Sequence, residues 1–468
     1  MNFIEFGFWP RLIICLGLAL FVRWIFFSRR NRDPALFDKI ALASTSLYLL
    51  ACVGTLTFSI FLLLATLSYL GILIIARVPP NRRRLFLGFY IPILLAPLVY
   101  FKYRTFFLQQ VIGWETLTLD AIAIPAGISF YTFQKIAVLV DASRLPHYRP
   151  KPLDFLNFAS FFPQVVAGPI ERKDDLMPQM EAFRLQVTMA NLNLAAPWLA
   201  LGFFYKVCLA DNLSPFIDRD AMASAWPILW NTLLFGFKIY FDFCGYSLIA
   251  LGIARAVGVR LTLNFRSPYL STNIRDFWRR WHVSLSYWFR DYVYIPLGGS
   301  QTKRWPINLL IVFVVSGLWH GAAWSFLLWG FLHGLYCVCG HLFKARLHLP
   351  RPIGWTFTMF LVFLAWLPFY ETRWEVLCNK AVLLATPTAY APSAALAWLS
   401  AFDPAELLTM FVAIGLCLFG FLIEFLSLRK DDRAYYSLAE NPILVALLIA
   451  ATVLLGSAQG NEFIYFSF

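Results

Sequence analysis

The sequence is poor in charged residues and has no low-complexity tract. Of its 468 residues, 14% are Asp, Glu, Lys or Arg, whereas 60% are hydrophobic. A soluble globular domain has roughly 25% charged and 45–50% apolar residues, and even a large one leaves much of its surface in water. The composition therefore excludes a cytosolic enzyme, a disordered chain and a nucleic-acid-binding domain. It indicates a polytopic membrane protein, for which lipid is the solvent of much of the surface.

The sequence also has few acidic residues and no closely spaced pair of cysteines of the C-x-x-C type. The chain has 26 Asp and Glu against 39 Lys and Arg, a net charge of +13. In a membrane protein such a surplus is expected, because Lys and Arg collect in cytoplasmic loops, although a basic mouth that attracts an anionic cofactor is compatible with it. The eight cysteines form no C-x-x-C pair, and we interpret them as small core residues rather than as zinc ligands or a disulfide framework.

Long apolar runs alternate with basic loops along the chain. A span needs about 20 apolar residues, and arginine clusters separate the early runs, which places those loops on the cytoplasmic side. The runs lie near 12–27, 39–77 (long enough for two spans), 85–101, 119–140, 190–209, 223–257, 306–322, 324–343, 352–370, 406–428 and 441–457. The sequence predicts an all-α polytopic fold in a single integral membrane domain over 1–468, with about 11–13 spans. The stretches 153–168 and 241–257 are candidate re-entrant segments.

The region from 262 to 304 departs from this pattern. Aromatic and apolar residues recur there at steps of three and four, which predicts one face of a continuous helix that ends near Pro296. These residues are Trp278, Trp281, Leu285, Trp288 and Tyr292. Composition alone favours an amphipathic helix that lies in the membrane interface. That interpretation does not account for His282, which stands in the middle of the segment.

A second histidine, His320, lies in an otherwise apolar stretch. An ionisable group at membrane depth is costly and is therefore a functional candidate, although a neutral histidine bonded across helices is the structural alternative. An imidazole can take a proton from a hydroxyl near neutral pH, as acyl transfer from a thioester to a hydroxyl requires. We interpret His333, which also lies in an apolar run, as a structural residue. Lys238 and Asp242 stand four residues apart, a spacing that predicts an ion pair within one helix.

At these residues the chain resembles the membrane-bound O-acyltransferase family, and within it the bacterial alginate O-acetyltransferase branch. Five blocks carry the resemblance: Pro125 to Gln134, Phe161 to Ile170, Tyr240 to Ser247, Asp276 to Gly299, and the sequence Leu-Trp-His-Gly-Ala at 318–322. They lie within residues 95–345, which we take as the family core, with 1–94 and 346–468 as peripheral spans.

The resemblance implies a fold in which helices surround a central tunnel where a cytoplasmic donor and an acceptor meet. It places the catalytic histidine of the family at His320 and its second polar position at His282. It further implies a multi-pass protein of the bacterial inner membrane that uses acetyl-CoA as donor substrate, with no permanently bound cofactor and no metal. The expected acceptor is an extracytoplasmic polysaccharide such as alginate or cellulose, reached through a periplasmic acetyl-transfer partner protein.

Basic residues on the cytoplasmic side would bind the phosphates of the donor. The candidates for donor binding are Arg275, Arg279, Arg280, Arg290, Asn264 and Trp319. For each arginine, ordinary positive-inside topology is the alternative. Two other functions stay open: a transporter subunit for a polysaccharide or small molecule, with histidines that relay protons, and an acyltransferase whose donor is an acyl carrier protein. Consumption of acetyl-CoA separates the transferase from the transporter.

Overall fold

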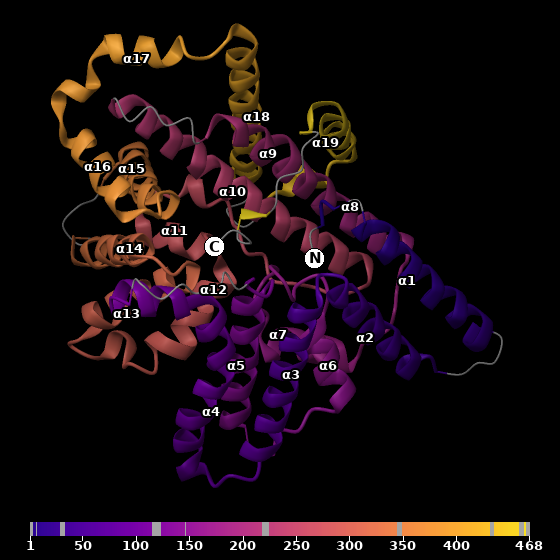
Figure 1. Cartoon of the computed structure of the whole chain (residues 1–468). Helices are drawn as coiled ribbons and strands as arrows, with labels where there is room; N and C mark the ends of the chain where they lie inside the picture. The colour runs from indigo at the N-terminus through magenta and orange to yellow at the C-terminus, as the bar shows by residue number, and fades with distance from the viewer. Residues whose placement is uncertain are drawn as a thin grey trace. The chain divides into compact units, whose positions relative to one another are not determined.

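The structure, a computed structural model, describes residues 3–5, 7–28, 33–114, 123–145, 147–217, 224–343, 349–430, 435–457 and 463–464. Within these ranges the chain forms nineteen α-helices and no strand. Short 3-10 and π-helical turns join the helices, whose arrangement is shown in Figure 1. The predicted all-α polytopic fold is confirmed. The first residues of the predicted span at 119–140 lie outside the described ranges.

Eight helical segments of the described chain are long and apolar enough to cross a membrane. They are Phe8–Phe27, Thr55–Ile75, Pro80–Tyr103, Met189–Phe216, Ala225–Ala256, Trp324–Phe343, Arg351–Tyr370 and Pro404–Leu428. Two shorter apolar helices, Trp305–His320 and Pro442–Leu455, accompany them. The chain is therefore a multi-pass membrane protein.

The chain divides into two compact units, of which the first comprises Met1–Ala196 and Ile249–Leu263. Its helices are α1 (Phe8–Arg23), α2 (Ala35–Ala51), α3 (Thr55–Ile75), α4 (Arg83–Leu98), α5 (Ile128–Arg144), α6 (Pro152–Ser160), α7 (Lys173–Glu181) and the start of α8 (Met189–Phe203). Helices α3, α4 and α5 pack side by side (Figure 1). The single domain predicted over 1–468 stays a prediction.

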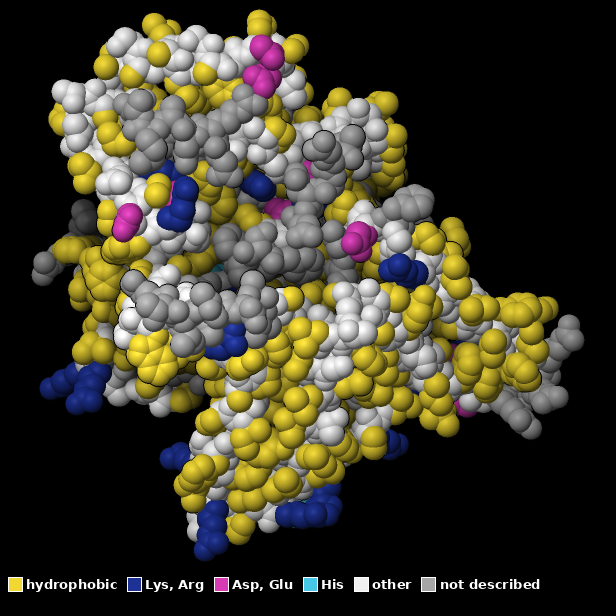
Figure 2. Space-filling view, viewed as in Figure 1, with side chains coloured by type: hydrophobic (Ala, Val, Ile, Leu, Met, Phe, Trp, Pro, Cys, Tyr) yellow, Lys and Arg dark blue, Asp and Glu magenta, His cyan; other side chains and the backbone are white. Residues whose placement is uncertain are grey.

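The outer face of this helix group is apolar. Leu85, Phe89 and Ile93 of α4 are largely exposed, and Figure 2 shows hydrophobic side chains over these helices, with Lys and Arg at the end where α3 connects to α4. That connection holds Arg77 and the arginines at 82–84. Exposed apolar side chains on a spanning helix face lipid, and the adjoining arginines belong at the membrane boundary.

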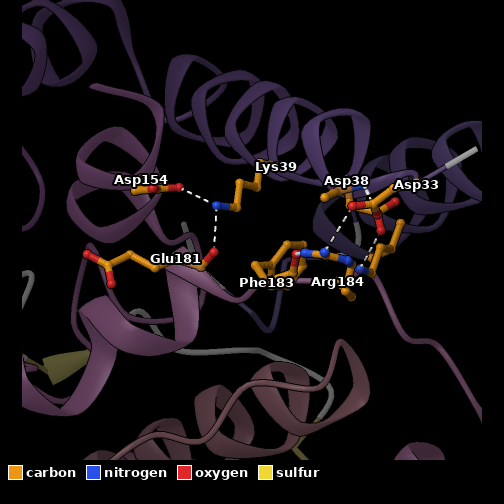
Figure 3. Close-up of polar contacts among 9 residues, drawn as sticks. Asp33, Asp38, Lys39, Asp154, Glu181, Phe183 and Arg184 are labelled. Atoms are coloured by element: carbon orange, nitrogen blue, oxygen red, sulfur yellow. Dashed lines mark hydrogen bonds and ion pairs between the residues drawn. The ribbon is translucent and has the colours of Figure 1, made fainter. Parts of the chain in front are cut away.

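Opposite charges tie α2 to the segment around α6 and α7. The Lys39 ammonium donates to Asp154 Oδ1 and to the Glu181 carbonyl, both at 2.6 Å (Figure 3). Asp38, fully buried beside it, pairs with Arg23 at 2.9 Å and accepts the backbone N–H of Leu185 at 3.2 Å. Because an unpaired charge in such surroundings is costly, these contacts fix how α2 packs on α6 and on the chain that follows α7.

The second unit comprises Pro197–Leu248 and Asn264–Phe468. Its helices are α9 (Asp211–Leu213), most of α10 (Ala225–Ala256), α11 (Ile274–Arg280), α12 (Val283–Phe289), α13 (Trp305–His320), α14 (Trp324–Phe343), α15 (Arg351–Tyr370), α16 (Trp374–Ala385), α17 (Pro392–Leu399), α18 (Pro404–Lys430) and α19 (Pro442–Leu455). Helices α13 and α14 form a tight hairpin. They lie so close that a Cβ on Gly317 would collide with the Phe326 carbonyl, and one on Gly330 with the Phe313 carbonyl. The glycines thus allow the close approach that places the end of α13.

The continuous helix predicted around residues 276–292 is wrong. The chain instead breaks between α11 and α12 at His282, whose φ of 42° is left-handed. Asn264 explains the break: its carbonyl accepts the N–H of Val283 and its side-chain Oδ1 that of Ser284, each at 3.0 Å. A second helix can begin here because these first N–H groups, which have no partner within the helix, are satisfied.

Candidate active site

His282 directly precedes α12 and is 1% exposed. Its ring lies edge-on to Phe243 of α10, with centroids 4.7 Å apart, and parallel to that of Phe265 at 6.5 Å. Burial in these surroundings lowers the pKa of His282 to about 3, because a charged imidazolium would lose its hydration. The ring is therefore neutral at physiological pH and can donate one hydrogen bond and accept another.

His320 is the last residue of α13 and is 3% exposed. Three aromatic rings surround its imidazole, those of Trp319, Trp329 of α14 and Phe369 of α15, at centroid distances of 5.0, 5.0 and 5.2 Å. The ring is thus held between three helices by contacts that leave little freedom to rotate.

Trp319 connects the two histidines. Its indole ring lies 5.9 Å from the ring of His282 and 5.0 Å from that of His320. The structure thus brings together two residues that are far apart in the sequence, both predicted as catalytic, around a third that was predicted to bind the donor. Two imidazoles beside one indole, buried among aromatic rings, are suited to proton transfer where water is excluded.

The basic donor-binding candidates lie on or just after α11 and α12. Arg275 and Arg279 are exposed on α11. Arg280 pairs with Asp276 one turn earlier at 3.0 Å, and Arg290 pairs with its neighbour Asp291 at 2.6 Å. Their role in binding a donor stays a prediction, as does that of Asn264, for which the structure adds the capping contacts described above.

Comparison with known proteins identifies the family. The membrane-bound O-acyltransferase family matches residues 84–371, more than half of the chain. The chain belongs to this family. The acyltransferase class predicted from the sequence is thereby confirmed.

Named bacterial proteins are similar to this membrane-bound O-acyltransferase over about half of the chain or more. A peptidoglycan O-acetyltransferase of Helicobacter pylori is 33% identical over 78% of this chain and 77% of its own length. A probable alginate O-acetylase of Azotobacter vinelandii is 36% identical over 60% of this chain and 59% of its own. A teichoic acid D-alanyltransferase of Bacillus subtilis is 31% identical over 47% of this chain and 59% of its own. The resemblance to the alginate O-acetyltransferase branch is confirmed.

A buried ion cluster of the acyltransferase was recognised only in part from the sequence. Asp242 of α10 bonds to Lys206 at 2.6 Å, and the same ammonium reaches Asp211 at 2.7 Å. The other oxygen of Asp242 accepts the N–H of Ile464 at 2.8 Å. The i,i+4 spacing indicates Lys238 as a partner of Asp242, and that pair stays a prediction. No spacing rule connects Asp242 to Lys206, which lies on another helical segment.

Two further ionisable groups in the second unit of this acyltransferase are fully buried. His333 of α14 is fully buried against Trp278 and Trp329, each 4.9 Å away between ring centroids. Glu424 of α18 is also fully buried and bonds to tyrosines. Glu424 is not among the site residues predicted from the sequence, although an acid within an apolar run is a signal for function.

Proposed function

We propose that this protein is an inner-membrane O-acetyltransferase that moves an acetyl group from cytoplasmic acetyl-CoA towards an extracytoplasmic hydroxyl. The observation that carries the proposal is the convergence of His282 and His320 on Trp319 within the part of the chain that matches the acyltransferase family. The names of the peptidoglycan and alginate relatives support acetyl as the group and a cell-surface polymer as the final acceptor.

His320 acts as general base in this proposal. Its imidazole takes the proton of the acceptor hydroxyl as the hydroxyl oxygen attacks the carbonyl carbon of the thioester. When the tetrahedral intermediate collapses, the carbon–sulfur bond breaks and the imidazolium returns the proton to the departing thiolate. The acetyl ester and the free thiol are then the products, with atoms and protons balanced. Base catalysis of this kind contributes about 10²–10⁴-fold in rate.

His282 stabilises the developing oxyanion. Because burial keeps its imidazole neutral, it offers one N–H as a hydrogen-bond donor without adding a charge. Such a donor is most effective in a site that excludes water. Trp319 keeps the two imidazoles apart and in place. The exposed arginines of α11 bind the phosphates of the donor, as the sequence predicts.

The test uses the purified protein in nanodiscs with acetyl-labelled CoA. Wild type is expected to cleave the thioester, and His320→Ala to lose about 10²-fold or more of the rate, because the base is gone. His341→Ala is the matched control, since it removes an imidazole that packs on Trp305 at the far end of α14. Normal turnover by His320→Ala would show that the base lies elsewhere.

An acyl carrier protein is the alternative donor. The name of the teichoic acid D-alanyltransferase shows that a relative transfers an acyl group other than acetyl, so the donor is tested separately. Acetyl-CoA and an acetylated acyl carrier protein are therefore offered in parallel to the same nanodiscs. If only the carrier thioester is cleaved, the carrier protein and not acetyl-CoA is the donor, and the proposed roles of the histidines are unchanged.

The acceptor side is also part of the proposal. We take the final acceptor to be an exopolysaccharide such as alginate or cellulose, or peptidoglycan, reached through a periplasmic partner protein. Co-purification from membranes followed by identification of a periplasmic protein tests the partner. Loss of polymer acetylation in a strain that carries only His320→Ala tests the pathway as a whole.

A further inference from the structure

Left-handed backbone marks one region of the second unit. Within the described ranges, four residues other than glycine have a positive φ: His147, Ser267, His282 and Tyr436, the last three at 50°, 42° and 62°. Such conformations are costly for L-residues and persist only where their surroundings over-determine them, which is often at functional sites. Ser267, His282 and Tyr436 all belong to one connected group of contacts.

Glu424 is the centre of this group. Its side chain is fully buried in α18, and its Oε1 accepts hydrogen bonds from the hydroxyls of Tyr205 at 2.8 Å and Tyr240 at 2.6 Å. Tyr205 lies in the π-helical turn Phe204–Ala210 and Tyr240 in α10. One carboxylate thus joins three separate membrane-embedded elements.

Tyr436 extends the group towards the active site. Its hydroxyl lies 3.3 Å from that of Tyr240, donates to the Phe265 carbonyl at 3.2 Å and accepts the backbone N–H of Ser267 at 3.4 Å. The hydroxyl therefore binds the main chain on both sides of residue 266. Ser267, with its left-handed backbone, is held at that point.

The segment that Tyr436 holds is the one that shapes His282. Asn264 binds the first N–H groups of α12, and Arg266 donates its N–H to the carbonyl of Arg280 at 2.9 Å, so the segment binds the chain on both sides of His282. Phe265 also places its ring 5.1 Å from that of Trp281. The left-handed backbone of His282 is thus fixed by neighbours that depend on Tyr436.

We propose that Glu424, Tyr205, Tyr240 and Tyr436 form a positioning network that fixes the backbone of His282 for acyl transfer. The inference rests on the proposed function, because it assigns the network to the same reaction. In the described contacts these residues reach His282 through Phe265, Ser267 and Trp281, so each acts through another residue. If these residues only filled space, an apolar cluster would serve without the cost of a buried carboxylate. Hydrogen bonds have defined directions, so a network of them can fix the position of a backbone segment.

The first test is Tyr436→Phe, which removes one hydroxyl and preserves the ring. We expect kcat for acetyl transfer to fall about 10–100-fold, because a displacement near 1 Å can cost about 10²-fold. KM for acetyl-CoA should stay within about twofold, because the donor-binding residues are untouched. Tyr90→Phe is the matched control: it removes a hydroxyl that also donates to a main-chain carbonyl, that of Leu67 at 2.8 Å, in the first unit.

The second test compares Glu424→Gln with Glu424→Ala. The amide oxygen of Gln can accept the hydrogen bonds of both tyrosines, so this variant should keep most of kcat. The Ala variant leaves both hydroxyls without their acceptor and should lose about as much kcat as Tyr436→Phe. Equal loss in both variants, with both proteins folded, would overturn the proposal, because the negative charge and not the hydrogen bonds would then matter.

Hydrogen exchange measured by mass spectrometry gives a readout that needs no substrate. In Tyr436→Phe, the amides of residues 281–286 should exchange faster than in wild type, and in Tyr90→Phe they should not. Unchanged exchange together with wild-type kcat would overturn the positioning network. If wild type itself cleaves neither donor, the proposed function fails, while the exchange comparison still decides whether the network holds His282.

Discussion

Asn264 accepts a 3.0 Å hydrogen bond from the backbone N–H of Ser284 through its side-chain Oδ1. Its own carbonyl accepts the preceding N–H, that of Val283, at the same distance. One residue thus satisfies two N–H groups at the start of α12, directly after His282. These hydrogen bonds give Asn264 a structural role at the start of α12, which differs from the donor binding predicted for it. The structural role predicts a lower kcat on substitution, whereas donor binding predicts a higher KM for the donor.

Substitution of Asn264 separates the roles. Asn264→Ala should lower the free energy of unfolding by about 1 kcal/mol, as loss of a helix cap does, and should lower kcat because α12 no longer fixes His282. Asn264→Ser keeps an uncharged acceptor oxygen and should retain more of both than Asn264→Ala. Thermal unfolding in detergent and steady-state acetyl transfer measure the two effects. An increase in KM for the donor at unchanged kcat would instead support donor binding.

The pH dependence of the reaction should not report on His282. Burial lowers the pKa of His282 to about 3, so its imidazole stays neutral above about pH 5. We expect His282→Asn to reduce kcat at every pH while the midpoint of the acid limb of the profile stays where it is. A midpoint that moves with this substitution would mean that His282 changes its charge during turnover in the tested range.

Much of the architecture was available from sequence, because membrane insertion is governed by local composition. Apolar runs of sufficient length and the arginines between them predict spans such as Thr55–Ile75 without any long-range contact. The break between α11 and α12 could not be predicted from the sequence. The aromatic spacing from Trp278 to Tyr292 fits a continuous helix, and the group that ends this continuity is Asn264, some distance earlier in the chain.

The histidines could be found from the sequence because their signal is local. Their geometry could not be predicted, because it depends on contacts between distant parts of the chain. His320 is conspicuous as an ionisable group in an apolar run, a local signal. That Trp319 lies against both imidazoles depends on how α13 packs beside the start of α12. Likewise, Asp242 of α10 pairs with Lys206, which belongs to the π-helical turn Phe204–Ala210. Pairings between helices leave no periodicity in the sequence.

Glu171 should make the stability of the first unit depend on pH. Burial raises the pKa of its carboxyl group to about 8, against the opposing hydrogen bonds from Thr262. Between its ordinary pKa near 4.5 and about 8, the folded protein holds a proton that the unfolded chain has released. Stability should therefore fall as pH rises through this window, by at most about 1.4 kcal/mol per pH unit.

Glu171→Gln tests this dependence directly. The amide can still accept the N–H of Thr262 but does not titrate, so the decline in unfolding temperature between pH 5 and pH 8 should become shallower. Glu181→Gln is the matched control, since it keeps the main-chain carbonyl of Glu181 that binds Lys39. A slope that persists in Glu171→Gln would assign the proton to another group.

Glu371 and Lys380 supply the sharpest stability prediction. The Lys380 ammonium donates to Glu371 Oε2 at 2.9 Å, and these side chains are 1% and 4% exposed. Glu371→Ala should therefore destabilise the protein by about 3–5 kcal/mol, because it removes the carboxylate that a buried ammonium binds. Arg373 also bonds to Glu371, but its side chain is 66% exposed, so Arg373→Ala should cost less than about 1 kcal/mol.

The same pair predicts how acid acts and how the loss can be reversed. Although burial alone would raise the pKa of Glu371, the bonds from Arg373 and Lys380 lower it to about 2. Its contribution is therefore complete above the ordinary pKa near 4.5 and is lost as pH falls towards 2. Glu371→Leu combined with Lys380→Met removes both buried charges and should recover most of the stability that Glu371→Ala loses. If the double variant unfolds as readily as Glu371→Ala in chemical denaturation, the cost lies in packing and not in the orphaned charge.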